Sequence, residues 1–337
     1  MYRSELTVDL GAIRRNAATL LRSLGRAELW AVVKADGYGH GARAVAGAAV
    51  EAGARALCVA TVPEALELRD AFRDARIIVM GPCMNRELAD ARSARLELVS
   101  ADGEVPSGVP VHLKLDTGMG RWGLSELPAP PHGVVGLMTH LATADSDETF
   151  ARRQIAHFRV ATEPYAHLTR HAANSAAALR IAESRLDAAR CGIALYGLSP
   201  FGTDPADDGL EPALRWESHL AQVKLLRAGE SAGYGRRFVA GEDTWIGIVP
   251  VGYADGFRRD LTGTEVRVAG ERRRVVGTVS MDAFSVELDR QLPVATPVTI
   301  VGHGLLAEDH ARVAGTITYE LVSRIGTAPT RARRTVL

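Results

Sequence analysis

The chain has 337 residues, of which 47% are hydrophobic and 24% are charged, as in an ordinary soluble globular protein. Its 40 basic and 40 acidic side chains give a formal net charge of zero, so the overall charge favours neither a nucleic acid nor an anionic membrane as a partner. No apolar run approaches the length of a membrane span, and the first ten residues lack the basic and hydrophobic regions of a signal peptide, so we expect a cytoplasmic protein.

The length exceeds that of most single domains and predicts one large α/β domain with a smaller second one. Three cysteines, Cys58, Cys83 and Cys191, are odd in number and widely spaced. Cys58 and Cys83 lie inside or just after apolar runs. We interpret all three as reduced structural thiols that form neither a disulfide framework nor a metal site.

The first 200 residues alternate between short apolar runs and helical patterns. After a helix-like stretch at Leu10–Leu24, eight apolar runs predict parallel strands at Leu29–Val33, Ala56–Ala60, Ile77–Met80, Leu96–Val99, Val109–Leu115, Val134–Thr139, Leu168–His171 and Ala188–Gly192. Helical patterns separate several of them, at Ala42–Ala52, Pro63–Phe72, Arg86–Arg95, Thr149–Ala161 and Ser175–Glu183. This order predicts an α/β fold, a TIM-type (β/α)8 barrel with reactive residues at the carboxyl ends of its strands.

Two connections are too short for a complete barrel. Only ADGEVPSG lies between Ser100 and Val109, and only GLSELPAPPHG lies between Trp122 and Val134. A parallel crossover usually needs a dozen or more residues and a helix. We therefore expect a barrel that lacks its helices after strands 4 and 5, and whose exposed wall is covered by a neighbour, a loop or polar side chains.

From about Glu217 the pattern changes to short strands separated by glycine and proline turns. These predict a β-rich C-terminal domain with strands at Ala221–Leu226, Thr244–Pro250, Glu265–Val268, Arg274–Val279, Phe284–Leu288 and Val298–Val301, and a last helical segment at His310–Ile325. The linker is expected near Gly202–Gly209. We place the barrel domain at residues 1–215 and the β-domain at residues 216–337.

The stretch Leu29–Gly41, LWAVVKADGYGHG, brings Lys34 from the end of a buried strand into a glycine-rich turn. Only three of the 40 basic side chains are lysines, so each lysine is either a chance survivor or a residue whose task arginine cannot perform. An amine, unlike a guanidinium, can lose its proton near neutral pH and form a Schiff base with a carbonyl cofactor. The glycines let a bulky group approach, and Tyr38 could cover it.

The sequence KADGYGHG resembles the pyridoxal 5'-phosphate (PLP) lysine motif of alanine racemases, and six motifs in the same order extend the resemblance over roughly residues 5 to 331. It implies a PLP-dependent enzyme that interconverts L- and D-alanine and supplies D-alanine for peptidoglycan. Racemisation needs a proton removed from one face of the substrate and returned to the other, so two bases on opposite faces are a direct solution. The resemblance assigns them to Lys34 and to Tyr253 of the partner subunit, which implies a homodimer with shared active sites.

Loops after the seventh and eighth strands of such a barrel commonly bind phosphate, and here they contain Asn174, Ser175, Gly192 and Ile193. For Ser175 a simple helix N-cap is the alternative. The resemblance implies that Ser175, Gly192, Ile193 and Tyr319 hold the PLP phosphate, and we count Asn174 with the cofactor-binding residues.

Arg190, in DAARCGIALYG, would ordinarily be a surface salt-bridge partner. The resemblance implies instead that its guanidinium faces the pyridine nitrogen of PLP and keeps it largely unprotonated, which disfavours transamination. His140, in MTHLATAD, matches a histidine that hydrogen-bonds the catalytic tyrosine, and we include it at the cofactor site; a structural histidine is the alternative. A phenol needs such help to act as a base near neutrality.

The segment HLKLDTGMGRWG resembles another racemase motif, in which Arg121 contacts the substrate and the catalytic tyrosine. Lys114 matches a lysine that is often carbamylated and orients that arginine; a buried ion pair with Asp116 is the alternative. In VSMDAF, Met281 and Asp282 match the region that binds the substrate carboxylate.

Thr278 and Ser280 stand where the family often has arginine and cysteine. These changes leave open a racemase of the same fold that acts on serine or another small amino acid. A non-catalytic PLP-binding protein is an alternative of a different class, and the retention of both candidate bases argues against it.

Overall fold

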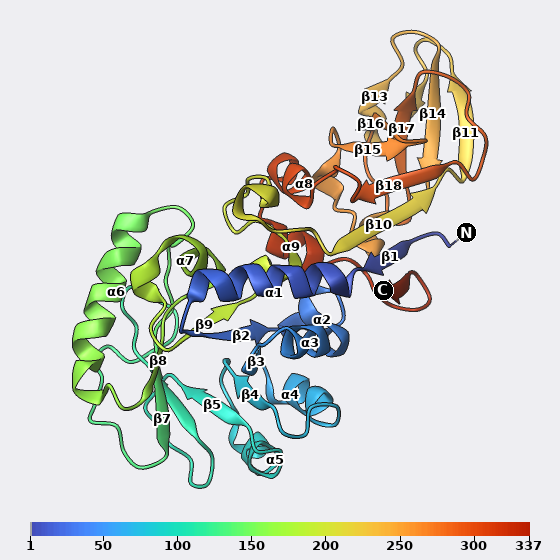
Figure 1. The fold of residues 1–337 in the computed structure, drawn as a ribbon. Helices are drawn as coiled ribbons and strands as arrows, with labels where there is room; N and C mark the ends of the chain where they lie inside the picture. Colours follow the sequence, from blue (N-terminus) through green and yellow to red (C-terminus); the bar gives the residue numbers. More distant parts are fainter. Residues whose placement is uncertain (1) are drawn as a thin grey trace. The chain divides into compact units, whose positions relative to one another are not determined.

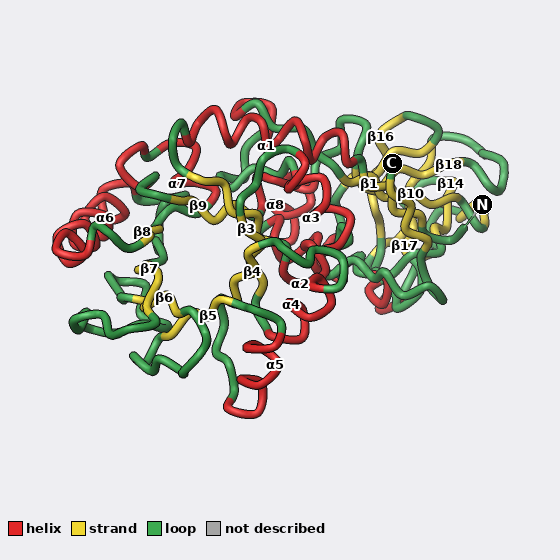
Figure 2. The backbone as a smooth tube through the Cα atoms, turned by 60° about the horizontal axis from the view of Figure 1, so that its bottom comes forward, coloured by secondary structure: helices red, strands yellow, loops and turns green. Residues whose placement is uncertain are grey.

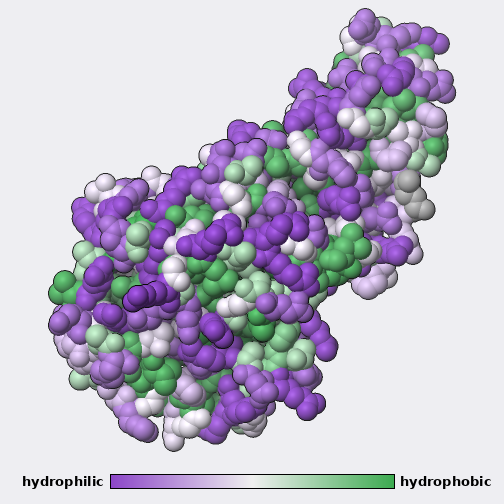
Figure 3. Space-filling model, viewed as in Figure 1, coloured by the Kyte–Doolittle hydropathy of each residue, from purple (hydrophilic) through white to green (hydrophobic). Residues whose placement is uncertain are grey.

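The computed structural model describes residues 2–337, and the chain divides into two compact units. We call Gly11–Phe201 with Pro205–Glu211 the barrel unit, and the remaining described residues, 2–10, 202–204 and 212–337, the sheet unit. Figure 1 shows the strands and helices of the first unit and the β-rich second unit. Hydrophilic side chains predominate on the face of both units shown in Figure 3, with apolar side chains scattered among them. Within the described chain, no helix has the length and apolar character needed to span a membrane.

The barrel unit contains a closed barrel of eight parallel strands, which confirms the predicted TIM-type fold. The barrel closes because the first strand pairs with the last, with Trp30 opposite Arg190. Its strands are β2 (Glu28–Val32), β3 (Ala56–Val59), β4 (Arg76–Val79), β5 (Glu97–Ser100), β6 (Val111–Lys114), β7 (Val134–Met138), β8 (Thr169–His171) and β9 (Ala188–Cys191). The first and last residues of each strand lie inside the predicted strand or within two residues of it.

Helices cover part of the barrel, and local sequence explains their starts. Thr61 accepts a hydrogen bond from the backbone of Glu64 and the Glu64 carboxylate accepts one from Thr61, a capping box that begins α4. Asp147 caps α6 by accepting a hydrogen bond from the Phe150 amide. The helices of this unit are α1 (Leu10–Leu24), α2 (Lys34–Tyr38), α3 (Ala42–Glu51), α4 (Val62–Arg69), α5 (Leu88–Ser93), α6 (Glu148–Thr162) and α7 (Ser175–Arg180).

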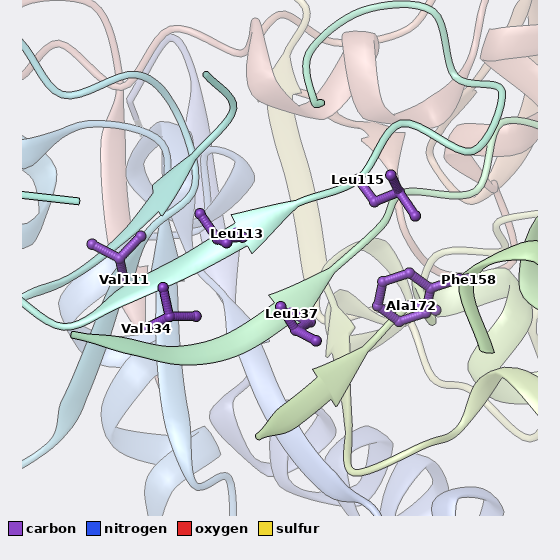
Figure 4. Packing of buried hydrophobic residues seen from close by; sticks show 7 residues of the cluster. All are labelled: Val111, Leu113, Leu115, Val134, Leu137, Phe158 and Ala172. Carbon is purple, nitrogen blue, oxygen red and sulfur yellow. The ribbon is translucent and has the colours of Figure 1, made fainter. Parts of the chain in front are cut away.

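Neither connection flanking β6 contains a helix, in a part of the chain that is described throughout. Figure 2 shows loops alone on that side of the barrel. Because side chains alternate along a strand, His112 points inward while Val111 and Leu113 point outward. The outward residues join the cluster in Figure 4, and Val105 and Leu127 from the two short connections pack against it. The loops themselves therefore cover the wall that the missing helices leave open.

The sheet unit is built on nine strands in the order β11-β14-β17-β16-β15-β18-β10-β1-β19. Phe257 and Phe284 stack in its core with ring centroids 4.2 Å apart. The strands are β1 (Glu5–Val8), β10 (Leu214–His219), β11 (Gln222–Leu226), β14 (Thr244–Val249), β15 (Glu265–Val268), β16 (Glu271–Val276), β17 (Phe284–Leu288), β18 (Pro297–Val301) and β19 (Arg333–Val336), with a small hairpin of β12 (Ser231–Ala232) and β13 (Phe238–Val239). The predicted last helical segment forms two helices, α8 (Ala307–Ala314) and α9 (Thr318–Ser323), because Gly315 adopts a left-handed conformation between them.

The N-terminal strand lies outside the barrel, although we expected the barrel domain to span residues 1–215. β1 pairs antiparallel with β10 and parallel with β19, so residues 5–8 belong to the sheet unit rather than to the barrel. The expected linker at Gly202–Gly209 is also partly in the barrel unit. There the side chain of Asn16 accepts a hydrogen bond from the Glu211 amide and donates one to its carbonyl, both at 2.8 Å. The physical cause in both places is pairing between segments about 200 or more residues apart.

The three cysteines are free, and none forms a disulfide within the described chain. Cys58 and Cys191 are fully buried in β3 and β9. Burial raises the pKa of both thiols to about 12, so they remain protonated and unreactive near neutral pH. This agrees with their interpretation as structural thiols.

Candidate active site

Lys34 stands just beyond the carboxyl end of β2, half-buried at the mouth of the barrel. Burial lowers the pKa of its amine, and the nearby Arg121 guanidinium lowers it further, whereas the Glu64 carboxylate acts in the opposite direction. The amine therefore loses its proton more readily than a solvated lysine. This is the property that a nucleophilic or basic lysine requires.

The turn after this lysine is strained. Ala35, Asp36 and Gly37 have φ values of 52°, 50° and 62°, a left-handed conformation that disfavours residues with a Cβ atom by roughly 1–2 kcal/mol each. Two carboxylates hold it: Glu64 accepts a hydrogen bond from the Ala35 amide at 2.7 Å, and Asp36 accepts one from Ala42 at 2.9 Å. Strain maintained by specific acceptors is characteristic of functional turns.

Tyr38 packs against the loop after β9. Its buried ring lies 5.0 Å from that of Tyr196, whose hydroxyl donates a hydrogen bond to the Val32 carbonyl at 2.9 Å. A Cβ atom at Gly192 would lie only 2.6 Å from the Tyr38 hydroxyl. Position 192 therefore requires glycine, and the packing joins the lysine turn to the loop expected to bind phosphate.

Ser175 and Gly192 meet in the structure, as the phosphate prediction requires. The buried Ser175 hydroxyl accepts hydrogen bonds from the backbone N–H groups of Gly192 at 3.1 Å and Ala194 at 3.4 Å, and Ile193 between them is buried. The alternative that Ser175 is an N-cap is wrong, because Asn174 is the cap of α7 and accepts from the third residue of that helix at 3.0 Å.

Arg190 is buried inside the barrel, so the alternative of a surface salt bridge is wrong. Its Nη1 donates to His171 Nδ1 at 2.7 Å and to the same residue's carbonyl at 3.0 Å. Nη2 donates to the carbonyls of Thr139 at 2.8 Å and Ala172 at 3.3 Å, and lies 3.4 Å from His140 Nδ1. Burial lowers the pKa of the guanidinium to about 10, which still leaves it charged at neutral pH. Among the described residues Nε has no hydrogen-bond partner, so it is available to a ligand.

Lys114 does not pair with Asp116. The Asp116 carboxylate instead accepts hydrogen bonds from the backbone N–H groups of residues 118, 119 and 120 at 2.8–2.9 Å. Lys114 Nζ lies 5.7 Å from the centre of the Trp122 ring, which Arg121 also approaches at 5.3 Å. Burial, followed by the charges of Arg121 and Arg190, lowers the pKa of Lys114 to about 8.

His140 is a neutral imidazole in this environment. Burial, and then the charges of Arg190, Lys114, Arg121 and Lys34, lower its pKa to about 3. Its Nδ1 faces a donor nitrogen of Arg190, so the proton of the neutral ring belongs on Nε2. Four cationic side chains that act on one histidine make this end of the barrel a favourable place for an anionic ligand.

The remaining candidates lie in the sheet unit. Tyr253 is in a 3-10 turn (Tyr253–Asp255) and is 44% exposed, and Met281 is 53% exposed. Backbone hydrogen bonds from Tyr253 to Ser280 at 3.1 Å and from Ala254 to Met281 at 3.0 Å bring the two loops together. A Cβ atom at Gly252 would lie within 2.5 Å of the carbonyl oxygens of residues 280 and 281, so only glycine permits this approach.

Asp282 and Tyr319 are placed differently. The Asp282 carboxylate forms an ion pair with Arg331 at 2.7 Å, so it acts as an anchor of its loop in this structure. Tyr319 lies on α9. Tyr253 itself lines a cavity of about 540 Å³ together with four arginines, at positions 237, 258, 259 and 324, and the acidic residues Asp260 and Glu320.

Two family models match this chain. The one described as alanine racemase, N-terminal domain, matches residues 8–200, and the one described as alanine racemase, C-terminal domain, matches residues 213–333. The chain belongs to the alanine racemase family. It is 41% identical to the alanine racemase of Beutenbergia cavernae, with 96% of each protein covered, and 38% identical to alanine racemase 1 of Bacillus subtilis, with 94% of this chain and 90% of that protein covered.

Solved structures of the alanine racemase family have the same fold. The biosynthetic alanine racemase from Pseudomonas aeruginosa is 36% identical, with a TM-score of 0.90 and complete coverage of both chains. The alanine racemase from D-cycloserine-producing Streptomyces lavendulae is 34% identical, with a TM-score of 0.91 and coverage of 100% of this chain and 97% of that one. These likenesses confirm the family and fold that the motifs predicted.

The sequence reasoning missed polar residues inside the barrel. His112, His171 and Glu97 were not selected, although all three contact one another or Arg190. The available signal was a histidine within an otherwise apolar strand, in VPVHLKL and LTRHAAN. A buried histidine requires hydrogen-bond partners, but the sequence does not say which ones.

Proposed function

We propose that this protein interconverts L- and D-alanine with PLP as its cofactor. The observation that carries this proposal is Lys34, a lysine with a lowered pKa on a strained turn at the carboxyl end of a barrel strand, close to the guanidinium groups of Arg121 and Arg190. Membership of the alanine racemase family supports the reaction. A related alanine racemase, from Bacillus anthracis, has been solved with bound L-Ala-P and is 33% identical with a TM-score of 0.88.

The residues of the barrel unit fit PLP. The backbone N–H groups of Gly192 and Ala194 point at the Ser175 hydroxyl, and this serine and loop would hold the phosphate, with Tyr319 as a further proposed ligand. Arg190 is held by its terminal nitrogens and retains Nε for the pyridine nitrogen. Tyr38 would pack beside the cofactor. When bound, PLP supplies an electron sink for the negative charge that develops at the substrate Cα.

The proposed reaction requires two proton-transfer groups. The Lys34 amine would hold or release a proton at Nζ on one face of the substrate, and Tyr253 of the partner subunit would do so at its hydroxyl on the other. The exposure of Tyr253 supports a role toward a second chain. Neutral His140, with its proton on Nε2, and the Arg121 guanidinium would stabilise the phenolate, since one can donate a hydrogen bond and the other carries a positive charge.

The other site residues would bind and orient the substrate. Arg121 would contact the substrate carboxylate, as would the backbone of the Met281–Asp282 loop, whose position Arg331 secures. Arg190 would keep the pyridine nitrogen unprotonated, because arginine does not release its proton readily. This limits the electron sink and favours racemisation over transamination.

Racemisation and shared sites are tested together by subunit exchange. With PLP and L-alanine, the wild-type protein should produce D-alanine, whereas Lys34→Ala and Tyr253→Phe dimers should each lose at least about 10³-fold in kcat. An equal mixture after verified exchange should recover about a quarter of the wild-type activity, because half of the dimers are hybrids with one intact site. Lys224→Ala, at an exposed lysine, is the matched control.

The outcomes separate the alternatives. Cofactor binding without D-alanine production in the wild type would leave a non-catalytic PLP-binding protein. No recovery after exchange would contradict sites shared between subunits. Growth of a D-alanine-requiring bacterium on this protein, expressed in its cytoplasm, would test the proposed supply of D-alanine for peptidoglycan.

Serine or another small amino acid is the second candidate substrate, because Thr278 and Ser280 replace residues frequent in the family. Thr278 is buried, and its hydroxyl donates to the Tyr234 carbonyl at 2.8 Å, so it anchors a loop. Its smaller side chain provides no cation where the family often has one. A panel of L-amino acids distinguishes the two: kcat/KM greatest for alanine supports the first proposal, and a clear preference for serine contradicts it.

A further inference from the structure

A continuous chain of hydrogen bonds crosses the interior of the barrel. It begins at Arg190 on β9, whose Nη1 lies 2.7 Å from His171 Nδ1. His171 Nε2 lies 3.0 Å from His112 Nδ1, and His112 Nε2 lies 2.8 Å from Glu97 Oε2. Glu97 in turn accepts two hydrogen bonds from Arg76, at 2.8 and 3.0 Å. Glu97 and Arg76 are the first residues of β5 and β4, so the chain reaches the amino ends of the strands, away from Lys34.

The donors and acceptors in this chain can be assigned without ambiguity. A guanidinium has only donors, so His171 Nδ1 must accept, and the ring proton lies on Nε2. That proton is donated to His112 Nδ1, which places the proton of His112 on Nε2, where it is donated to the Glu97 carboxylate. Burial lowers the pKa of both histidines, which keeps them neutral. Every bond between Arg190 and Glu97 therefore runs toward Glu97, and Arg76 donates to Glu97 from the other side.

The surrounding residues pack closely around the imidazole rings of His112 and His171. His112 and His171 are fully buried. Trp30 packs on them at centroid distances of 5.7 and 4.5 Å, and the Arg76 guanidinium lies 5.0 Å from the Trp30 ring. On the next strand a Cβ atom at Gly136 would lie 2.1 Å from His112 Nδ1, so this position must be glycine for the histidine pair to form.

The hydrogen-bond chain joins two charged groups, Arg190 and Glu97. Arg190 contacts carbonyl oxygens and imidazoles, and no carboxylate forms an ion pair with it in residues 2–337. The hydrogen-bond chain links it instead to Glu97, at the far end of the two histidines, a carboxylate that also pairs with Arg76. Burial alone would raise the pKa of Glu97, but the hydrogen bonds from His112 and Arg76 lower it to about 2, so it is a carboxylate at any ordinary pH.

We propose that His171 and His112 are positioning residues that connect Arg190 to Glu97, fixing the orientation of its guanidinium and moderating its donor strength toward the pyridine nitrogen. Polarised hydrogen bonds strengthen one another along a chain. The chain thus engages Arg190 through Nη1, on the side away from the ligand, and Nη2 is held by backbone carbonyls, which leaves Nε for the pyridine nitrogen. This inference rests on the proposed function for its catalytic consequence, but the hydrogen-bond chain itself exists without a cofactor.

Histidine tautomers test the chain directly. In protein labelled with ¹⁵N histidine and prepared without PLP, long-range ¹H–¹⁵N correlation spectra should show His112 and His171 neutral and protonated on Nε2 from pH 6 to 9. In Glu97→Gln the Nε2 proton signals of both should move upfield, because the negative acceptor is lost. Asp187→Asn is the matched control, since it removes an ion pair with Arg170 at the amino end of β8, outside the chain. Protonation on Nδ1, or equal spectra for both variants, would overturn the proposal.

The PLP-loaded enzyme supplies a second readout. During turnover of alanine, occasional transamination yields pyruvate and pyridoxamine 5'-phosphate in equal amounts. Loss of the Glu97 charge makes Arg190 a stronger donor to the pyridine nitrogen, so Glu97→Gln should raise pyridoxamine phosphate per racemisation by about three- to tenfold, while the KM for alanine stays within about twofold. An unchanged ratio in a folded Glu97→Gln enzyme would contradict the proposal.

A second variant ensures that the test does not depend on the folding of Glu97→Gln alone. His112→Phe keeps an aromatic ring beside Trp30 and interrupts the chain, and it should change the transamination ratio in the same direction. If it does not fold, Glu97→Gln and the tautomer spectra still decide. An inactive wild type would contradict the proposed function. The histidine spectra recorded without PLP would still test whether the hydrogen-bond chain exists.

Discussion

Lys114 illustrates how a buried amine responds to the cations around it. Its side chain is 4% exposed as part of a buried strand, and Asp116, its neighbour in sequence, is occupied by three backbone amides. With the pKa lowered to about 8, roughly half of the amine is neutral at pH 8, and only the neutral amine reacts with carbon dioxide. The resulting anion could pair with Arg121 or Arg190.

We therefore predict carbamylation of Lys114. Incubation with ¹³C-bicarbonate at pH 8 should give a carbamate carbon signal in the wild type that is absent in Lys114→Arg and retained in Lys224→Arg. Acidification to pH 6 should remove the signal, because protonation of the amine competes with carbon dioxide. Absence of a carbamate signal from the wild type at pH 8 would contradict the prediction.

Position 136 must be glycine because His112, on the neighbouring strand β6, leaves no space for a side chain there. Gly136→Ala would place a methyl group within 2.1 Å of His112 Nδ1, and we expect overpacking to lower the free energy of unfolding by about 1–3 kcal/mol. Gly241→Ala is the control, since a Cβ atom there meets nothing within 4 Å. Urea unfolding of the two variants measures the difference, and equal stabilities would show that β7 can shift without loss.

At the level of elements, Asp255 holds together the turn that carries Tyr253. The Asp255 side chain is 1% exposed and accepts hydrogen bonds from Arg3 at 2.9 Å, Arg331 at 2.8 Å and the Gly252 amide at 2.9 Å. Arg331 also pairs with Asp282 on the adjoining loop. The two ends of the described chain thus meet at the two loops that contain the candidate substrate and proton-transfer residues.

Asp255→Asn should destabilise the sheet unit by about 1.5–3 kcal/mol, because it removes the charge of a buried carboxylate that accepts hydrogen bonds from two partly exposed guanidinium groups. Hydrogen exchange of β14 and β17 amides would report this loss. Asp289→Asn, at a carboxylate whose side chain is 49% exposed, should cost less than about 1 kcal/mol. Equal protection of these amides in both variants would contradict the anchoring role.

For the whole molecule, buried neutral histidines determine the response to acid. His112, His140, His171 and His310 all have a lowered pKa, chiefly through burial. Below about pH 6.5 the unfolded chain binds protons at these positions that the folded chain does not, so stability falls as the pH decreases. Each such histidine contributes up to about 1.4 kcal/mol per pH unit.

This predicts a marked loss of stability between pH 7 and pH 5. The urea midpoint should decrease over that range, and the decrease should be smaller in a variant that lacks one of these groups. His310→Phe is suitable, because His310 bonds to Thr264 and to the Ile300 carbonyl, neither of which is a candidate site residue. A midpoint that stays constant from pH 7 to 5 would contradict the prediction.

The sequence determined much of this protein by itself. Periodicity and order predicted the barrel strands, the length of two connections predicted the missing helices, and Lys34 could be singled out because lysine is rare here and follows a buried strand. These features depend on residues close together in the chain. The pairing of β1 with β10 and β19, the burial of Arg190, and the meeting of His112, His171 and Glu97 were decided only by the tertiary structure, because strand register and closure of the barrel bring together residues that are remote in sequence and leave no local pattern.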